Sequence, residues 1–270
     1  MNGPGVSSAR SYFCSKCQER FRHPVGRCSR CGCGVIVREL RDGPAELAPV
    51  PLSEVKVKAE EERATSGVRC LDALLGGGLP HGYSVLVSAD GGLGKSTLLL
   101  EAACRSGLRS LYATSEEDSL KVAGRARRLE LPVEHASSYR IERGEDLLSA
   151  LERSVYDLAV LDSVQATSFM GAPPGHVQAS LALVKALHDW AHRSGAAAFV
   201  ICHETKEGDA AGPNALKHAV DAVVGLGWPK DPEEDATDDE RVLYVLKNRA
   251  GPAPKKMRVV LTAHGFSEVT

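Results

Sequence analysis

Short apolar runs alternate with amphipathic segments along the chain from about residue 65 onward. The runs typical of β-strands lie at 83–89, 109–115, 158–164 and 197–202, and the segments typical of helices lie at 95–105, 119–129 and 177–193. Apolar strands that are separated by amphipathic helices indicate a parallel sheet with both faces covered. We therefore predict an α/β domain with a mostly parallel central sheet flanked by helices.

The last part of the chain has a different pattern. Three further apolar runs, at 222–226, 242–246 and 258–262, follow one another with no helix of length between them. Strands that are joined without a crossover helix pair antiparallel, so a mixed C-terminal edge of the sheet is expected. The acidic segment 231–240 lies between two of these runs and is typical of a solvated hairpin loop.

Changes in composition predict four segments. Residues 1–9 are small and polar, and we expect them to be disordered. A cysteine-rich module is expected at 10–37, and a linker that contains three prolines is expected at 38–64. The large α/β domain is expected to occupy 65–270.

Overall composition excludes several classes of protein. Hydrophobic residues make up 43% of the chain and charged residues 25%, as in a soluble globular protein. The 33 Lys and Arg residues nearly balance the 35 Asp and Glu residues, which excludes a uniformly basic coat protein for nucleic acid. No apolar run reaches the roughly 18–20 residues of a membrane span, and the N-terminal residues lack the pattern of a secretory signal. We therefore expect a cytoplasmic location and no membrane partner.

Four cysteines near the N-terminus have the spacing of a zinc site. Cys14 and Cys17 form one Cys-x-x-Cys pair, and Cys28 and Cys31 form a second pair after ten intervening residues. Two such turns supply four thiolates to one tetrahedral ion and leave no open position, so we expect Zn²⁺ in a structural role. Cys33 is a spare thiol that competes with Cys31, although the spacing favours Cys31.

The cysteine-rich module is also basic. Eight Lys or Arg residues but only two Glu residues lie between residues 10 and 41. A basic surface of this kind suits the phosphates of nucleic acid. A surface that docks a protein partner is an equally open interpretation.

A phosphate-binding loop is expected between an apolar strand and a helix. Its residues are Ala89, Asp90, Gly91, Gly92, Leu93, Gly94, Lys95, Ser96 and Thr97. In this context backbone N–H groups wrap the β-phosphate, Lys95 reaches the β- and γ-phosphates, and the Ser96 hydroxyl binds Mg²⁺. The pattern has glycine at its first position, where this chain has Ala89, but the Gly-Lys-Ser-Thr end is intact. A glycine-rich helix start with an incidental lysine is the weaker alternative.

Acidic residues at the ends of two apolar strands are candidates for metal and water chemistry. Asp162 ends one strand, which places it near Mg²⁺ at the carboxyl edge of the sheet. Glu116 and Glu117 follow another strand, and either carboxylate could orient and deprotonate the attacking water. His203 follows a third strand, in position to sense the γ-phosphate. A strand-end acid can instead cap a helix.

Together these motifs resemble the bacterial RadA (Sms) family of RecA-like DNA-repair ATPases. The four-cysteine finger, the phosphate loop and the acidic strand ends carry the resemblance in their order along the chain. The other segments that carry it are 71–79 (LDALLGGGL), 112–117 (YATSEE), 161–165 (LDSVQ), 205–208 (TKEG), 211–213 (AGP) and 247–251 (KNRAG).

The resemblance implies a RecA-like ATPase fold and a homo-oligomeric ring that uses ATP, with Mg²⁺, to act on single-stranded or branched DNA in recombinational repair. Lys95, Ser96, Asp162 and Glu116 would form the ATP site, with Glu117 as the alternative water activator. A recombinase is the protein partner that such a role implies.

The resemblance also implies where DNA and a neighbouring subunit are contacted. The loop 204–214 would lie against DNA, with Lys206 as the first phosphate contact and Lys217 as a second. Lys247 and Arg249 belong to the signature that reads Lys-Asn-Arg-Phe-Gly in the family and lies near the subunit interface. There a cation from one protomer would stabilise charge on the neighbour's γ-phosphate. Without the resemblance, both residues are exposed charges at the end of a strand.

The sequence departs from the family pattern at several places. Ala250 replaces the aromatic residue of the signature, Ala89 replaces the first glycine of the phosphate loop, and Pro24 and Gly34 stand where the finger has tryptophans. The chain stops at Thr270, so no counterpart of the family's C-terminal Lon-like domain is expected. A second hypothesis is therefore a RecA-fold ATP-binding switch that docks protein partners through its finger. Salt-dependent DNA binding separates the two hypotheses.

Overall fold

The computed structural model describes residues 11–14, 17, 19–21, 27–32, 37–40, 63–203, 212–229 and 237–269. The chain divides into two compact units, Met1–Lys58 and Ala59–Thr270. The expected disordered N-terminus, most of the expected linker and residues 231–236 of the acidic segment lie outside the described residues. The finer boundaries expected at residues 9, 37 and 64 stay predictions.

The first unit contains a small antiparallel sheet. Its strands are β1 (Ser11–Cys14), β2 (Arg20–Phe21) and β3 (Val37–Leu40), in the order β2-β1-β3. β1 ends at Cys14, whose backbone N–H donates a hydrogen bond to the carbonyl oxygen of Glu19. The sheet therefore positions the first cysteine of the cluster.

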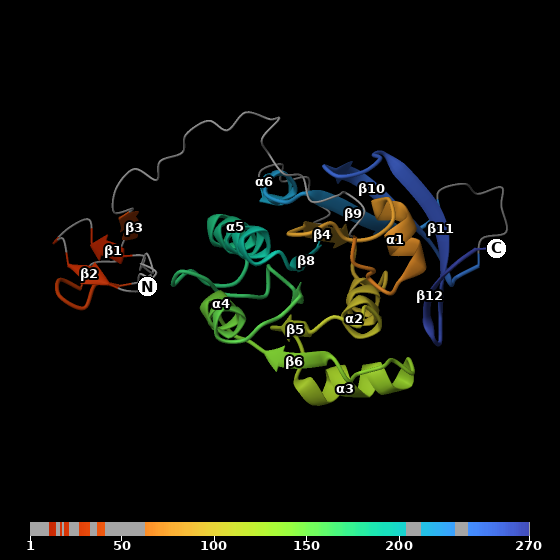
Figure 1. The fold of residues 1–270 in the computed structure, drawn as a ribbon, viewed down its shortest axis with the longest axis horizontal. Helices are drawn as coiled ribbons and strands as arrows, with labels where there is room; N and C mark the ends of the chain where they lie inside the picture. The colour runs from red at the N-terminus through yellow and green to blue at the C-terminus, as the bar shows by residue number, and fades with distance from the viewer. Residues whose placement is uncertain are drawn as a thin grey trace, which may run out of the picture. The chain divides into compact units, whose positions relative to one another are not determined.

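The second unit is built on a nine-stranded sheet with the order β12-β11-β10-β9-β4-β8-β7-β5-β6 (Figure 1). The strands are β4 (Ser84–Ala89), β5 (Ser110–Thr114), β6 (Ala136–Arg140), β7 (Leu158–Asp162), β8 (Ala197–His203), β9 (Ala222–Gly227), β10 (Glu240–Asn248), β11 (Lys255–Thr262) and β12 (Gly265–Glu268). Neighbouring strands from β9 to β6 pair parallel, and β9 to β12 pair antiparallel. The predicted α/β fold with a mixed C-terminal edge is confirmed.

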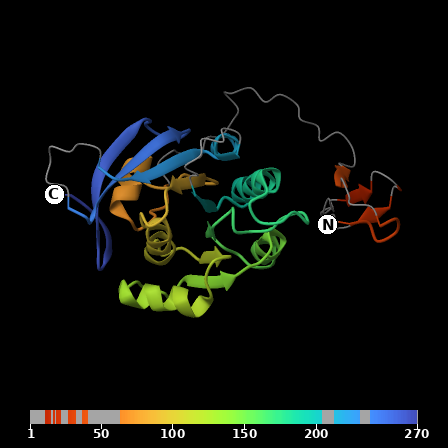
Figure 2. The ribbon, with the colours of Figure 1, turned by 180° about the vertical axis from the view of Figure 1, so that it is seen from behind.

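Helices cover both faces of this sheet. They are α1 (Arg69–Leu75), α2 (Lys95–Arg105), α3 (Ser119–Arg128), α4 (Gly144–Arg153), α5 (Val177–Ser194) and α6 (Gly212–His218). α1, α2 and α3 share one apolar core with Val85 and Val87 of β4, whereas α4, α5 and α6 share a second core with Leu86. Alternate side chains of one buried strand thus face opposite helical layers. Figure 2 shows the same layers from behind, with the antiparallel strands β10–β12 in blue.

Two elements in the middle of the chain were not predicted. β6 is the edge strand of the sheet, and none of its side chains is fully buried. α4 follows it and buries Leu147 and Leu151 against the second core. An edge strand needs no apolar run, so the pattern that marks the central strands is missing here.

Among the described residues, none of the helices combines the length and the apolar character that a bilayer crossing requires.

Candidate active site

The carboxyl ends of four parallel strands lie side by side at one edge of the sheet. β4, β8, β7 and β5 are consecutive neighbours. In their registers Ala89 lies opposite His203, and Thr114 lies opposite Asp162. This edge therefore gathers the predicted phosphate loop, Asp162, His203 and the acidic pair that follows β5.

The phosphate loop joins β4 to α2, as the sequence predicts. Gly92 and Gly94 have φ of 80° and 99°, which glycine adopts without the steric cost of a Cβ. A Cβ on Gly94 would also lie 2.9 Å from Cζ of Phe266. Ala89, by contrast, is the last residue of β4 and does not have a positive φ. The structure thus accommodates alanine at the first position of the loop.

Lys95 begins α2, and its side chain is buried. Its Nζ donates hydrogen bonds to the carbonyl oxygens of Ala89 (2.8 Å) and Asp90 (2.7 Å). Burial lowers the pKa of Lys95, while the nearby carboxylates, Asp162 first among them, oppose this shift. The ammonium group is therefore held against the start of the loop.

Asp162 is the last residue of β7 and is buried. The Tyr112 hydroxyl donates a hydrogen bond to Oδ2. Burial raises the pKa of Asp162, and hydrogen bonds from Tyr112 and Ser96 offset part of that rise. The other oxygen, Oδ1, is buried and has no hydrogen-bond partner among the described residues. A carboxylate that interacts with the Ser96 hydroxyl and keeps one oxygen without a partner fits Mg²⁺, because hard cations take oxygen ligands.

The two adjacent glutamates have different surroundings. Oε1 of Glu116 accepts a hydrogen bond from Ser163 Oγ (2.7 Å) and lies 3.3 Å from Nε2 of His203. Glu117 forms an ion pair with Arg125 of α3. Only Glu116 of this pair contacts the groups at the ends of β7 and β8, so the geometry distinguishes two residues that the sequence leaves equivalent.

Gln165 holds His203 in place, a contact that the sequence does not predict. Its Nε2 donates to the carbonyl oxygen of His203 (2.9 Å), and its Oε1 accepts from the His203 backbone N–H (3.2 Å). Gln165 lies three residues beyond the end of β7, in the segment that carries the family resemblance. The sequence indicated a role for Gln165 only through its position as a polar residue just after the end of an apolar strand.

The residues expected to contact DNA or a neighbouring subunit lie away from this edge or outside the described residues. Lys206 is outside them. Lys217, at the end of α6, is half-buried, and its carbonyl oxygen accepts a hydrogen bond from Lys247 Nζ (3.1 Å). Arg249 pairs with Asp221 at 3.1 Å.

The segment with Lys247 and Arg249 lies near the amino ends of the parallel strands, whereas the phosphate loop lies at their carboxyl ends. Asn248 pairs with Ala222, the first residue of β9, and Ala222 also lies opposite Val85 near the start of β4. Lys95, in contrast, follows the end of β4. Burial lowers the pKa of Lys247, whose Nζ also donates to the carbonyl oxygens of His218 and Val220. Neither cation faces the phosphate loop of its own chain.

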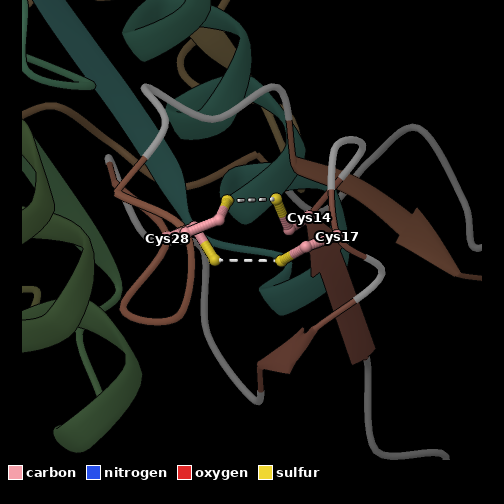
Figure 3. Close-up of side chains that lie close together, drawn as sticks. Cys14, Cys17 and Cys28 are labelled. Carbon is pink, nitrogen blue, oxygen red and sulfur yellow. Dashed lines mark hydrogen bonds between the residues drawn. The ribbon is translucent and has the colours of Figure 1, made fainter.

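The four predicted zinc ligands lie together in the first unit. The Sγ–Sγ distance is 3.7 Å for Cys14 and Cys31 and 3.5 Å for Cys17 and Cys28, and all four sulfurs lie within 4.8 Å of one another (Figure 3). With Zn–S bonds of about 2.3 Å, two sulfurs of a tetrahedral site are about 3.8 Å apart. The cluster therefore fits Zn²⁺. Cys33 lies outside the described residues.

Comparison with known proteins agrees with this geometry. Residues 51–209 match a family model described as an AAA domain. The chain is 34% identical to the DNA repair protein RadA of Pseudomonas aeruginosa over 98% of its own length and 60% of that protein. It is 32% identical to RadA of Aquifex aeolicus, with 96% and 59% covered, and 30% identical to RadA of Escherichia coli, with 97% and 60% covered. The chain thus spans about 60% of the length of these relatives.

A solved structure shows the same fold. The crystal structure of the RadB recombinase superposes with a TM-score of 0.60 at 20% identity and covers 77% of this chain and 100% of that one. The RecA-like core expected from the sequence is thereby confirmed. This chain belongs to the AAA domain family and is a homologue of the DNA repair protein RadA.

Proposed function

We propose that this chain is a Mg²⁺-dependent ATPase that couples hydrolysis to binding of single-stranded DNA and to processing of branched recombination intermediates. The observation that carries the proposal is the meeting of Lys95, Asp162, Glu116 and His203 at one edge of the sheet around the phosphate loop. The part that concerns DNA is supported by the likeness to RadA, which is named for DNA repair.

Each residue at this edge has a distinct task in the proposed reaction. Loop N–H groups and Lys95 bind the β- and γ-phosphates of ATP. Ser96 and Asp162 hold Mg²⁺, which when bound neutralises charge on the phosphate oxygens. Glu116 orients the attacking water and accepts its proton, because it is the carboxylate of the pair that is not engaged by Arg125. His203, in contact with Glu116, senses the γ-phosphate.

The test is steady-state ATP hydrolysis by the full chain with and without single-stranded DNA. We expect DNA to stimulate hydrolysis, and we expect Lys95→Ala to lower the rate about 10²–10³-fold because a phosphate-clamping cation is lost. The matched control is Lys121→Ala, which removes an exposed lysine of α3 and is expected to hydrolyse ATP at the parent rate.

Either of two results would count against the proposal. If the parent protein hydrolysed ATP no faster than the Lys95→Ala variant, the proposed ATPase activity would be wrong. Hydrolysis that is indifferent to DNA would favour a regulatory switch that docks partners through the finger.

DNA binding is proposed to depend on Lys206. Lys206→Ala should weaken binding of single-stranded DNA about equally for all sequences and reduce the slope of log affinity against log salt by about 0.7, because one phosphate contact is lost. ATP binding should not change. Fluorescence anisotropy at several salt concentrations measures this, and Lys121→Ala serves as the control. Unchanged DNA affinity in Lys206→Ala would place the contact elsewhere, with Lys217 the next residue to replace.

A ring of identical subunits is also proposed. Lys247 and Arg249 lie near the start of β4, whereas the phosphate loop of the same chain follows the end of β4. They would therefore meet only the nucleotide of a neighbouring protomer. Arg249 is the better candidate for this contact, because its side chain is 56% exposed whereas Lys247 Nζ is bound by three carbonyl oxygens. A recombinase is the proposed protein partner.

A further inference from the structure

Three side chains outside the nucleotide site form a compact cluster of potential metal ligands. His188 and His192 are four residues apart on α5, so they lie on one face of the helix. Asp221 directly precedes β9, near the amino ends of the parallel strands and away from the phosphate loop at their carboxyl ends. One potential ligand atom from each residue lies within 4.8 Å of the other two.

The distances in this cluster match those of a tetrahedral zinc site. Asp221 Oδ2 lies 3.4 Å from His188 Nδ1 and 3.2 Å from His192 Nε2. With zinc bonds of about 2.0–2.2 Å to nitrogen and oxygen, two ligand atoms at the tetrahedral angle are about 3.3 Å apart. The ring centroids of the two histidines are 4.3 Å apart, with the planes tilted by 56°, so the rings are not stacked. The carboxylate and the imidazoles therefore need little rearrangement to share one ion.

The carboxylate of Asp221 is held in position by its other neighbours. The backbone N–H and the Oγ of Ser84 donate to Oδ2 at 3.0 and 2.7 Å, and Arg249 donates to Oδ1 at 3.1 Å. Hydrogen bonds to a carboxylate fix its orientation, and the bond from Arg249 does so through the oxygen that is not a proposed ligand. The side chain of Asp221 is only 5% exposed, so its orientation is fixed before any ion binds.

The three residues and Ser84 form one hydrogen-bond network, in which Ser84 Oγ donates to Asp221 Oδ2 and lies 2.8 Å from Nδ1 of His188. An ion bound here would replace the protons on the two imidazole nitrogens and the hydroxyl donor at Oδ2. The backbone N–H of Ser84 would remain as the donor to that oxygen.

We propose that His188 Nδ1, His192 Nε2 and Asp221 Oδ2 bind a divalent transition-metal ion of the zinc class. Two imidazoles and one carboxylate suit Zn²⁺ and its neighbours, whereas Mg²⁺ and Ca²⁺ take oxygen ligands. Three protein ligands leave a fourth position for water or for a group from outside the chain. The side chain of His192 is 52% exposed, which gives an ion access from solvent. The ion would join α5 to the central strands of the sheet.

The test measures zinc bound by the full chain after metal removal, titration with Zn²⁺ alone and gel filtration. His192→Ala should bind about one equivalent less than the parent protein, irrespective of how many zinc ions the finger holds. His192 is chosen because it is exposed, so the variant should fold, which circular dichroism verifies. The matched control is His135→Ala, which removes an exposed histidine outside the cluster and should bind as much zinc as the parent.

A second experiment measures the unfolding temperature of the second unit with and without Zn²⁺. Zn²⁺ should raise the temperature at which this unit unfolds in a Cys28→Ser variant, whose finger is disabled, because an ion that binds only the folded state stabilises it. The rise should disappear when His192→Ala is added. Equal zinc binding by His192→Ala and the parent would overturn the proposal. Loss of the same equivalent in His135→Ala would do so too, since zinc would then bind without preference for the cluster.

Discussion

Glu116→Gln is expected to slow ATP hydrolysis about 10²–10⁴-fold, the usual contribution of a positioned general base. Glutamine preserves the size of the side chain and can still contact Ser163 and His203, but it cannot accept a proton from water. The affinity for ATP should therefore stay near that of the parent. Single-turnover hydrolysis and equilibrium binding of a fluorescent nucleotide measure the two quantities separately.

Glu117→Gln is the matched control, because it makes the same chemical change at the next residue. Glu117 pairs with Arg125, and both side chains are partly shielded from solvent. Loss of that ion pair should cost less than tenfold in hydrolysis, since the carboxylate does not contact His203 or Ser163. A larger loss in Glu117→Gln than in Glu116→Gln would assign the base to Glu117 instead.

The sequence predicts the central sheet well because its strands are apolar on both faces. β4, β5 and β7 are buried at every residue, and the helices between them have one apolar face, so the two patterns are easily separated. β6 is not predictable in this way. Among the described strands it pairs with β5 alone, and it exposes most of its side chains, so the tertiary pairing and not the local sequence determines the strand.

The candidate site is predictable as far as each strand end can be recognised. The phosphate loop could be predicted because it follows an apolar strand, β4. Asp162 could be predicted because it is the last residue of another apolar strand, β7. The difference between Glu116 and Glu117 is not predictable, because it arises from Ser163, His203 and Arg125, which come from three other parts of the chain.

The cluster of His188, His192 and Asp221 was missed for a related reason. Two histidines four residues apart in an expected helix were the available indication. Asp221 lies 29 residues beyond His192 and reaches the helix only through the pairing of β9 with β4. Side chains that a helix and the start of a distant strand bring together cannot be recognised from spacing alone.

Cys28→Ser is expected to unfold the first unit and to leave the second unit intact. A structural zinc ion contributes about 10–16 kcal/mol to the folding of small zinc-finger peptides, and a segment of about thirty residues buries too little apolar surface to replace it. Chelation is the less informative experiment, because it would also strip the proposed histidine site. Limited proteolysis should therefore remove the N-terminal residues of the variant, while a fragment that starts near Ala59 persists and binds ATP as the parent does.

Cys33→Ser provides the control for this experiment. Cys33 is the spare thiol of the module, and Cys31 is the cysteine whose Sγ lies with those of Cys14, Cys17 and Cys28. Cys33→Ser should therefore retain zinc and resist proteolysis as the parent does. If Cys28→Ser lost ATP binding together with its N-terminal residues, the two units would form one cooperative folding unit, because the four sulfurs lie in the first unit and the phosphate loop in the second.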